Sequence, residues 1–216
     1  MRVITIPVKS LDRSKSRLAT ILSTEERARL TMAMFETVLD ASVAQPEWEV
    51  WVISRDETVL DFAAERGVAT IRERGSTLLD AIEQVERDAQ RHHSTELAVV
   101  LADLPFATAA ALASTLATPE AVTAAPSISD GGTNVLVRRP PSAIPSRFGS
   151  SSFAKHRAEA YRRGLTFRSI EHETLAFDLD RAKDLQAIIE NQAETRTKAV
   201  CLEMGLADRL RLEIQS

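Results

Sequence analysis

The amino-acid sequence predicts a three-layer α/β domain of the Rossmann-like type, built on a mainly parallel, mixed sheet. Strand-like apolar runs alternate with helix-like runs along the chain. Successive strand–helix pairs start roughly 25–35 residues apart, which is typical of βαβ units. The length of 216 residues, with 44% hydrophobic and 27% charged residues, suits one globular domain with a substantial core. We therefore expect a single domain over residues 1–216, of which residues 191–216 form a C-terminal helical extension.

The first part of the chain holds three expected strands and two expected helices. The strands are the apolar runs, rich in β-branched residues, at 3–8, 49–54 and 68–71. The first helix begins at Ser23, because the Ser-x-x-Glu spacing to Glu26 is a capping box. The second helix begins at Asp56 or Thr58 and ends at Gly67.

The remaining elements continue this alternation. A helix over residues 76–92 has an apolar stripe at helical spacing and precedes the central strand, 97–101. Further helices are expected over 108–117 and over 152–163, the second of them ended by Gly164. The other expected strands are 121–126, 134–139, 165–170 and 175–180. A last helical stretch begins over 184–190.

Composition and charge exclude several classes of protein. A formal net charge of −4 gives no basic footprint, so we expect no nucleic-acid partner. No run is long and apolar enough for a membrane span or a secretory signal, so we expect no membrane partner and a cytoplasmic location. The single cysteine, Cys201, excludes an internal disulfide and a multi-cysteine metal site. The GxxxxGK(S/T) motif of P-loop proteins and the dinucleotide motif GxGxxG are both absent from the sequence.

Three cations follow the first expected strand. Lys9, Lys15 and Arg17 lie in the loop after residues 3–8. In a parallel α/β sheet such a loop leaves the carboxyl edge, where phosphates bind. The alternative is a solvated basic loop that is anchored by its leucines.

Three aspartates stand where a cation could bind. Asp103 follows the central strand, where a carboxylate is costly without a donor, a cation or water. It is either a cap or loop aspartate or a metal ligand at the carboxyl edge. Asp178 and Asp180 lie two apart in the expected strand 175–180, which places both carboxylates on one face, and a shared divalent cation would relieve their repulsion. The alternative for Asp180 is a cap on the following helix.

Two glycine-containing loops could bind an anion. In residues 129–134, Asp-Gly-Gly is followed by Thr133 and Asn134, and a simple hairpin turn is the alternative. Gly149 and three serines that end at Ser152 lead into the helix 152–163, whose free N–H groups and hydroxyls suit an anion. A plain N-cap is the alternative there. No Ser/His/Asp or Cys/His set is apparent, so we expect no covalent mechanism.

Five segments, taken in order, resemble one family. They are "IPVKSLDRSKSRLA", "VVLADLP", "DGGTN", "FGSSSFAKHRAEAYRRGL" and "LAFDLDRAKDL". The chain is similar, from residue 2 to about residue 190, to the phosphoenolpyruvate or 2-phospho-L-lactate guanylyltransferases of coenzyme F-420 biosynthesis. The most specific part of the resemblance is the glycine–serine segment with the Ser-Phe-Ala-x-His that follows it.

The resemblance implies a GT-A-like nucleotidyltransferase that uses GTP and Mg²⁺ and acts on a small phosphorylated three-carbon acid. The site residues that it implies fall into three groups: Lys9, Lys15 and Arg17 for the nucleotide; Asp103, Asp178 and Asp180 for the metal; Thr133, Asn134, Gly149 and Ser152 for the acid. Of these, Lys15, Arg17 and Asp103 are the expected catalytic residues. Leu79 departs from the family, because it stands near the nucleotide where an Asn is expected.

Several alternatives stay open on the sequence. The acceptor could be phosphoenolpyruvate, 2-phospho-L-lactate or 3-phosphoglycerate. A GT-A glycosyltransferase would also use an Asp-x-Asp such as 178–180, and Leu79 would suit a non-catalytic nucleotide-binding protein. A guanylyltransferase for the molybdenum cofactor is similar chemically, but its glycine-rich first loop is missing here. A homodimer is also possible.

Overall fold

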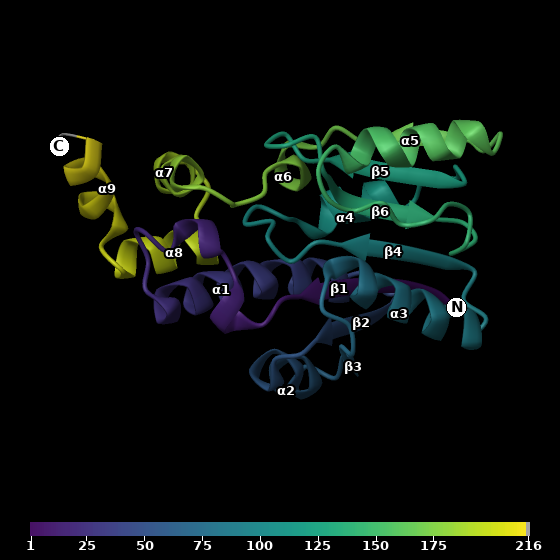
Figure 1. The fold of residues 1–216 in the computed structure, drawn as a ribbon, viewed down its shortest axis with the longest axis horizontal. Coiled ribbons are helices and arrows are strands. Elements are labelled where there is room, and N and C mark those ends of the chain that lie inside the picture. Colours follow the sequence, from purple (N-terminus) through teal and green to yellow (C-terminus); the bar gives the residue numbers. More distant parts are fainter. Residues whose placement is uncertain (215–216) are drawn as a thin grey trace.

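The computed structural model describes residues 1–214 and contains one seven-stranded sheet (Figure 1). Its strands are β1 (Arg2–Val8), β2 (Glu49–Ser54), β3 (Ala69–Arg72), β4 (Glu96–Val100), β5 (Val122–Pro126), β6 (Thr133–Arg138) and β7 (Phe167–Ser169). Their spatial order is β3-β2-β1-β4-β6-β5-β7. All the pairings are parallel except the two that β6 makes, with β4 and with β5. The expected mainly parallel, mixed sheet is therefore confirmed.

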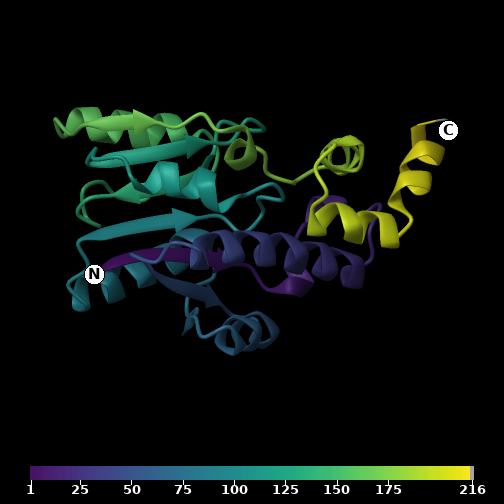
Figure 2. The same cartoon turned by 180° about the vertical axis from the view of Figure 1, so that it is seen from behind.

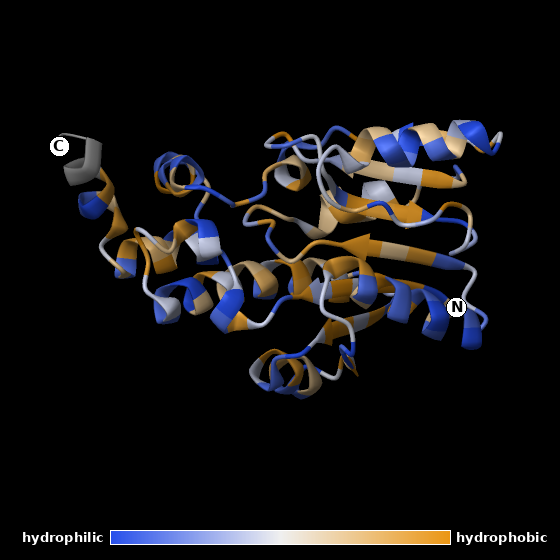
Figure 3. Ribbon diagram, viewed as in Figure 1, coloured by the Kyte–Doolittle hydropathy of each residue, from blue (hydrophilic) through white to orange (hydrophobic). Residues whose placement is uncertain are grey.

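Helices cover both faces of this sheet. The helices α1 (Thr24–Val43), α2 (Glu57–Glu65), α4 (Ala109–Leu116) and α6 (Glu173–Ala176) share one apolar cluster with the strands. The helices α3 (Leu78–Arg91) and α5 (Ser152–Arg162) cover the opposite face. Side chains alternate between the two faces, so Ile4 and Ile6 of β1 contact the first cluster and Val3 contacts α3. Figure 3 shows the apolar strands between helices with hydrophilic outer faces. The expected three layers are confirmed.

The helix starts follow the predicted capping chemistry in part. At the start of α1, Ser23 and Glu26 form the predicted capping box: the Ser23 Oγ accepts from the Glu26 N–H at 3.2 Å, and the Glu26 carboxylate accepts from the Ser23 N–H at 2.8 Å. Asp56, rather than Thr58, is the N-cap of α2. α3 begins at Leu78 and not at residue 76, because Thr77 and Asp80 form a second capping box there.

The prediction of a strand over residues 175–180 is wrong. The structure has the short helix α6 at Glu173–Ala176 and an irregular segment after it. The backbone of this segment bonds to separate places: the Leu175 carbonyl accepts from the Asn134 side chain, and the Leu179 N–H donates to the Asp103 carbonyl. A segment that crosses the ends of several strands in this way cannot form a ladder with any one of them. The argument that placed Asp178 and Asp180 on one strand face is therefore lost.

The C-terminal helices extend the molecule beyond the carboxyl ends of the strands (Figure 2). They are α7 (Ala182–Glu190), α8 (Arg196–Glu203) and α9 (Leu206–Ile214). Apolar side chains of all three pack against Leu30 and Met34 of α1, with the buried, unpaired Cys201 among them. Among the described residues, no helix combines the length and the apolar character needed to cross a membrane. This packing places the chain around residue 180 beside the loop that follows β1.

Candidate active site

A cleft of about 320 Å³ lies at the carboxyl ends of the neighbouring strands β1 and β4. The loop after β1 contributes Lys9, Lys15 and Arg17 to its wall. The segment after β4 contributes Asp103, and the segment before α7 contributes Asp180. Because β1 and β4 are parallel neighbours, the two loops leave the same edge of the sheet. The structure therefore brings together five of the residues singled out from the sequence.

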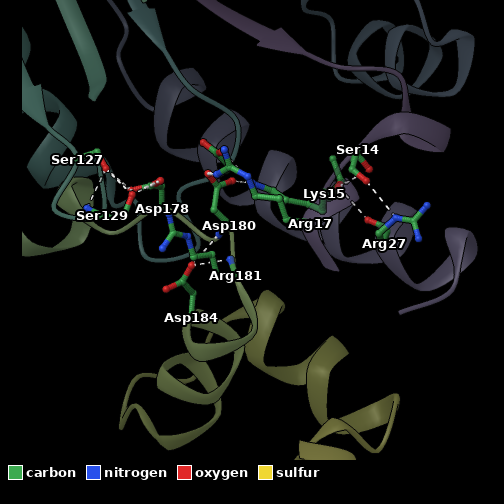
Figure 4. Close-up of polar contacts among 12 residues, drawn as sticks. Ser14, Lys15, Arg17, Arg27, Ser127, Ser129, Asp178, Asp180, Arg181 and Asp184 are labelled. Atoms are coloured by element: carbon green, nitrogen blue, oxygen red, sulfur yellow. Dashed lines mark hydrogen bonds and ion pairs between the residues drawn. The ribbon is translucent and has the colours of Figure 1, made fainter. Parts of the chain in front are cut away.

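Lys15 is at the centre of this cleft (Figure 4). Its ammonium Nζ lies 2.8 Å from Asp103 Oδ2 and 3.1 Å from Asp180 Oδ1, and only 8% of its side chain is exposed. Burial acts to lower the pKa of the Lys15 ammonium, but the charges of Asp103 and Asp180 outweigh it, so the pKa is raised. Lys15 also has a left-handed backbone with φ of 46°, which is uncommon for a residue with a side chain. The loop thus holds one buried cation between two carboxylates.

Residues of α1 and the N-cap residue of α2 fix the loop after β1. The buried guanidinium of Arg27 in α1 donates from Nε to the Ser14 carbonyl at 3.1 Å. The Thr31 hydroxyl, one turn further along α1, donates to Ser14 Oγ at 2.9 Å. Before α2, the Asp56 carboxylate accepts from the Leu11 N–H at 2.9 Å. None of these three anchors was identified from the sequence, because each is an ordinary helix or cap residue in its own segment.

Asp180 pairs with two cations of the loop, Lys15 and Arg17. Its second carboxylate oxygen accepts from Arg17 Nη1 at 3.0 Å. Asp180 does not cap α7, because Asp184 does so: the Asp184 carboxylate accepts from the backbone N–H groups of Asp180 at 2.9 Å and Arg181 at 2.7 Å. The capping alternative is therefore wrong, and the Asp180 side chain is directed into the cleft (Figure 4).

Asp178 has a different environment, although it is only two residues from Asp180. It is buried, and its carboxylate accepts from the hydroxyls of Ser127 at 2.6 Å and Ser129 at 2.9 Å. Burial raises the pKa of the Asp178 carboxyl, and the nearby charges of Asp103 and Asp180 raise it further. Ser127 directly follows β5, so the strand-end rule that identified Asp103 would have identified this serine as well.

Two carboxylates of the cleft, those of Asp103 and Asp180, are suited to bind a divalent cation. No group of three or more His, Cys, Asp or Glu side chains is arranged to hold a metal within the described part of the chain. Asp103 and Asp180 nevertheless converge on one positive charge, and the buried Oδ1 of Asp103 has no hydrogen-bond partner in that part of the chain. Magnesium is commonly held by one or two carboxylates together with substrate phosphates, so these two carboxylates suit it.

The residues expected to bind the acid form a second group. Thr133 and Ser152 are buried, and the Ser152 hydroxyl donates to Thr133 Oγ1 at 3.1 Å. Asn134 is also buried, and its side-chain amide donates to the Leu175 carbonyl at 2.8 Å. Gly149 is exposed and has a φ of 119°, which favours glycine. This group lies next to Asp178, because Ser127 also donates its backbone N–H to the Gly132 carbonyl.

Leu79 lies outside the cleft. It is partly exposed near the start of α3 and lines a separate hollow with Arg147 and Phe148. Its neighbour Leu78 lines the cleft instead. Position 79, where the resemblance leads us to expect an Asn, therefore does not line this cleft.

Solved structures that share this fold include a nucleotidyl transferase. A nucleotidyl transferase from Methanothermobacter thermautotrophicus superimposes with a TM-score of 0.63 at 12% identity, over 87% of this chain and 95% of that one. A CMP:2-keto-3-deoxy-manno-octonic acid synthetase, solved with CTP, superimposes with a TM-score of 0.58 at 13% identity, over 87% and 97% of the two chains. These likenesses show that the chain shares its fold with nucleotidyltransferases.

The relatives in sequence narrow this class. The family model described as "Guanylyl transferase CofC like" matches residues 1–211, and the chain belongs to that family. A phosphoenolpyruvate guanylyltransferase from Sphaerobacter thermophilus is 38% identical over 189 residues, which cover 86% of this chain and 91% of that protein. A 2-phospho-L-lactate guanylyltransferase from Methanothermobacter thermautotrophicus is 35% identical over 186 residues, which cover 85% and 82%.

Proposed function

We propose that this protein transfers GMP from GTP to the phosphate of a small phosphorylated acid, phosphoenolpyruvate or 2-phospho-L-lactate, and so acts in coenzyme F-420 biosynthesis. The names of the relatives support this acceptor class. The observation that carries the proposal is the cleft in which Lys15 and Arg17 meet Asp103 and Asp180 at the carboxyl edge of the sheet. Such a site offers basic side chains for a triphosphate and carboxylates for the magnesium ion that accompanies the triphosphate.

Lys9, Lys15 and Arg17 are the proposed nucleotide-binding residues. The guanidinium of Arg17 is largely exposed and can form a bidentate contact with a phosphate. Lys15 supplies a compact charge that can move from the carboxylates to a phosphate oxygen without leaving the cleft. The fixed backbone of this loop reduces the ordering that nucleotide binding requires.

Asp103, Asp180 and Asp178 are the residues that would hold Mg²⁺, which when bound would neutralise the charge on the triphosphate. In the transfer, an oxygen of the acid's phosphate forms a bond to the α-phosphorus of GTP, the bond from that phosphorus to the bridging oxygen breaks, and pyrophosphate leaves. That phosphate oxygen is already mostly ionised near neutral pH, so no protein base is needed. Lys15 and Arg17 bind and orient the triphosphate for the in-line attack.

Thr133, Asn134, Gly149 and Ser152 are the proposed acid-binding residues. The start of α5 supplies backbone N–H groups and hydroxyls, which suit a small anion without large side chains.

We propose a cytoplasmic location, because the unpaired Cys201 fits a reducing compartment. A homodimer stays a prediction.

The test is to measure pyrophosphate release from GTP and Mg²⁺ with phosphoenolpyruvate, 2-phospho-L-lactate or 3-phosphoglycerate added separately. Release that depends on both GTP and one acid supports the proposal, and the Asp103→Asn variant is the matched inactive control. Replacing GTP by ATP or CTP measures the base preference that Leu79 leaves open. In a separate reaction with a nucleotide-sugar donor, sugar transfer with release of the nucleoside diphosphate would indicate a glycosyltransferase instead, and GTP binding without turnover would indicate a non-catalytic protein.

A further inference from the structure

His156 is fully buried in α5 and contacts two segments of the proposed acid site. Its Nε2 lies 2.9 Å from the backbone nitrogen of Arg147, two residues before Gly149. Its Nδ1 lies 3.0 Å from Thr133 Oγ1 on β6. The ring also packs edge-on against Phe148, with ring centroids 5.2 Å apart. One side chain therefore connects the segment before Gly149 with the start of β6.

The hydrogen bonds of His156 fix which ring nitrogen carries the proton. The backbone N–H of Arg147 can only donate, so Nε2 must be the unprotonated nitrogen. Burial, with a smaller effect from the charges of Arg138, Arg147 and Lys155, lowers the pKa of His156 to about 3, so the ring is neutral. The proton of a neutral ring whose Nε2 accepts must be on Nδ1, and Nδ1 therefore donates to Thr133 Oγ1.

This donation determines what the Thr133 hydroxyl can do. Its oxygen accepts from His156 Nδ1 and also from the Ser152 hydroxyl at 3.1 Å. A hydroxyl has two acceptor positions and one proton, so both acceptor positions are used. The one further hydrogen bond that the Thr133 hydroxyl can make is therefore one in which it donates its own proton. A hydroxyl prepared in this way is a donor suited to an anionic oxygen.

We propose that His156 is a positioning residue for the phosphorylated acid: it orients Thr133 as a donor and holds the segment that carries Gly149 against the start of α5. This inference rests on the proposed function, because it takes Thr133, Gly149 and Ser152 as the acid site. It gives a role to the histidine of the Ser-Phe-Ala-x-His sequence, which has no contact with the nucleotide cleft among its described partners.

A second set of bonds holds residues 143–146 without His156. The carboxylate of Glu86 on α3 accepts from the Ser146 hydroxyl at 2.7 Å and from the buried guanidinium of Arg138 at 2.6 Å. Arg138 also donates to the Ile144 carbonyl at 3.2 Å. Loss of the His156 bonds should therefore displace residues 147–149 and reorient Thr133, while the rest of the segment stays in place.

Three variants separate the two hydrogen bonds of the ring. In His156→Asn the side-chain amide can still donate to Thr133 but is too short to reach Arg147. In His156→Gln the amide oxygen reaches the Nε2 position and can still accept from Arg147. His156→Leu makes neither bond. The KM for the acid should rise about threefold to tenfold for each bond lost, and most in His156→Leu, while the KM for GTP stays within about twofold of the wild type.

Ser152→Ala, Gly149→Val and Val85→Ala are the controls. Val85 is a buried residue of α3 that packs with Val3 and Leu97, away from the acid site. Val85→Ala should therefore lower stability without changing the acid site. If His156→Leu changes both KM values together, or resembles Val85→Ala in its kinetics and its melting temperature, His156 is only a core residue and the inference is overturned. If Ser152→Ala and Gly149→Val raise the KM for the acid and the His156 variants do not, the inference alone fails. If Ser152→Ala and Gly149→Val also bind the acid normally, the proposed acid site itself is wrong.

Discussion

Lys15→Met should make the free protein respond to magnesium more strongly than the wild type does. Met matches the four-atom stem of Lys, so the substitution keeps the apolar stem and removes the ammonium that lies between Asp103 and Asp180. The two carboxylates then lose the cation that they share, and only Asp180 keeps a partner, Arg17. In the wild type, a divalent ion that binds them must first displace Lys15, and in the variant it need not.

The structure sets the size of the effect. Removing one partner of a fully buried ion pair costs about 3–5 kcal/mol, but exposed pairs contribute about 1 kcal/mol or less. Asp103 and Asp180 are 26% and 30% exposed, so an intermediate loss applies. We expect Lys15→Met to lower the free energy of unfolding by about 1–3 kcal/mol. For a chain of this length that is a fall in melting temperature of roughly 3–10 °C. Magnesium at about 100 times its Kd would restore about 2.7 kcal/mol.

Thermal unfolding without nucleotide, with and without MgCl2, measures both changes, and Mn²⁺ binding followed by electron paramagnetic resonance gives the affinity directly. Arg13→Met is the matched control, because Arg13 lies on the same loop and is paired only with its neighbour Asp12 among the ion pairs that the structure describes. The reasoning is refuted if MgCl2 raises the melting temperature of Lys15→Met no more than that of the wild type and Arg13→Met. In that case the two carboxylates do not hold the cation.

Three further predictions concern single residues. Arg17→Ala should raise the KM for GTP more than the KM for the acid, because its guanidinium is expected to hold the triphosphate; the opposite split in steady-state kinetics would mean that the two sub-sites are exchanged. Asp178→Asn should lose most of the activity and keep the free energy of unfolding within about 1 kcal/mol, since burial makes the ionised carboxyl costly in the free protein; full turnover at ordinary magnesium would contradict this. His156, with a pKa of 6.5 when unfolded and about 3 when folded, takes up its proton first in the unfolded chain as the pH falls. Its contribution to stability is therefore complete above pH 6.5 and decreases below it, by about 2 kcal/mol at pH 5. The cations that face the ring are Arg138, Arg147 and Lys155. Urea unfolding at pH 7.5 and pH 5 should show this loss in the wild type and not in His156→Gln, and equal losses in the two proteins would disprove it.

The alternation of strands and helices was sufficient to predict the fold. Each parallel strand of the first half has a β-branched apolar run, and the capping box at Ser23 begins α1 as expected. The same pattern failed at residues 175–180. Leu175 and Leu179 are both buried, as the strand pattern predicts, but Ala176 and Asp178 at the alternate positions are buried too, and the backbone of the segment bonds to three different parts of the fold. Periodicity reports which side chains are buried, and it does not report which backbone groups pair.

The candidate site could be predicted where it depends on strand ends and not where it depends on packing between distant segments. Lys15 and Asp103 both follow parallel strands, so a shared edge was expected, but their contact requires β1 and β4 to be neighbours. Ser152 was expected as a donor at a helix start, and its hydroxyl instead donates to the buried Thr133. A sequence shows that a helix begins with serines, and only the packing of α5 decides which of them faces the core.

Lys15, Arg17, Asp103 and Asp180 form a charge-balanced set within a cleft that Lys9 and Arg13 also line, and this balance determines how these four residues should accept the substrates. Lys15 and Arg17 carry two positive charges, and their partners Asp103 and Asp180 carry two negative charges. A triphosphate alone would leave these carboxylates beside more negative charge, and a divalent cation alone would leave Lys15 beside more positive charge. When the triphosphate and the divalent cation bind together, each residue exchanges its partner for another of the same sign. Lys15 and Arg17 then contact phosphate oxygens in place of carboxylates, and the carboxylates contact the divalent cation in place of Lys15 and Arg17. We therefore expect the nucleotide to bind with its metal as one unit, so that the Kd for GTP falls with added magnesium, and the Kd for magnesium falls with added GTP by the same factor.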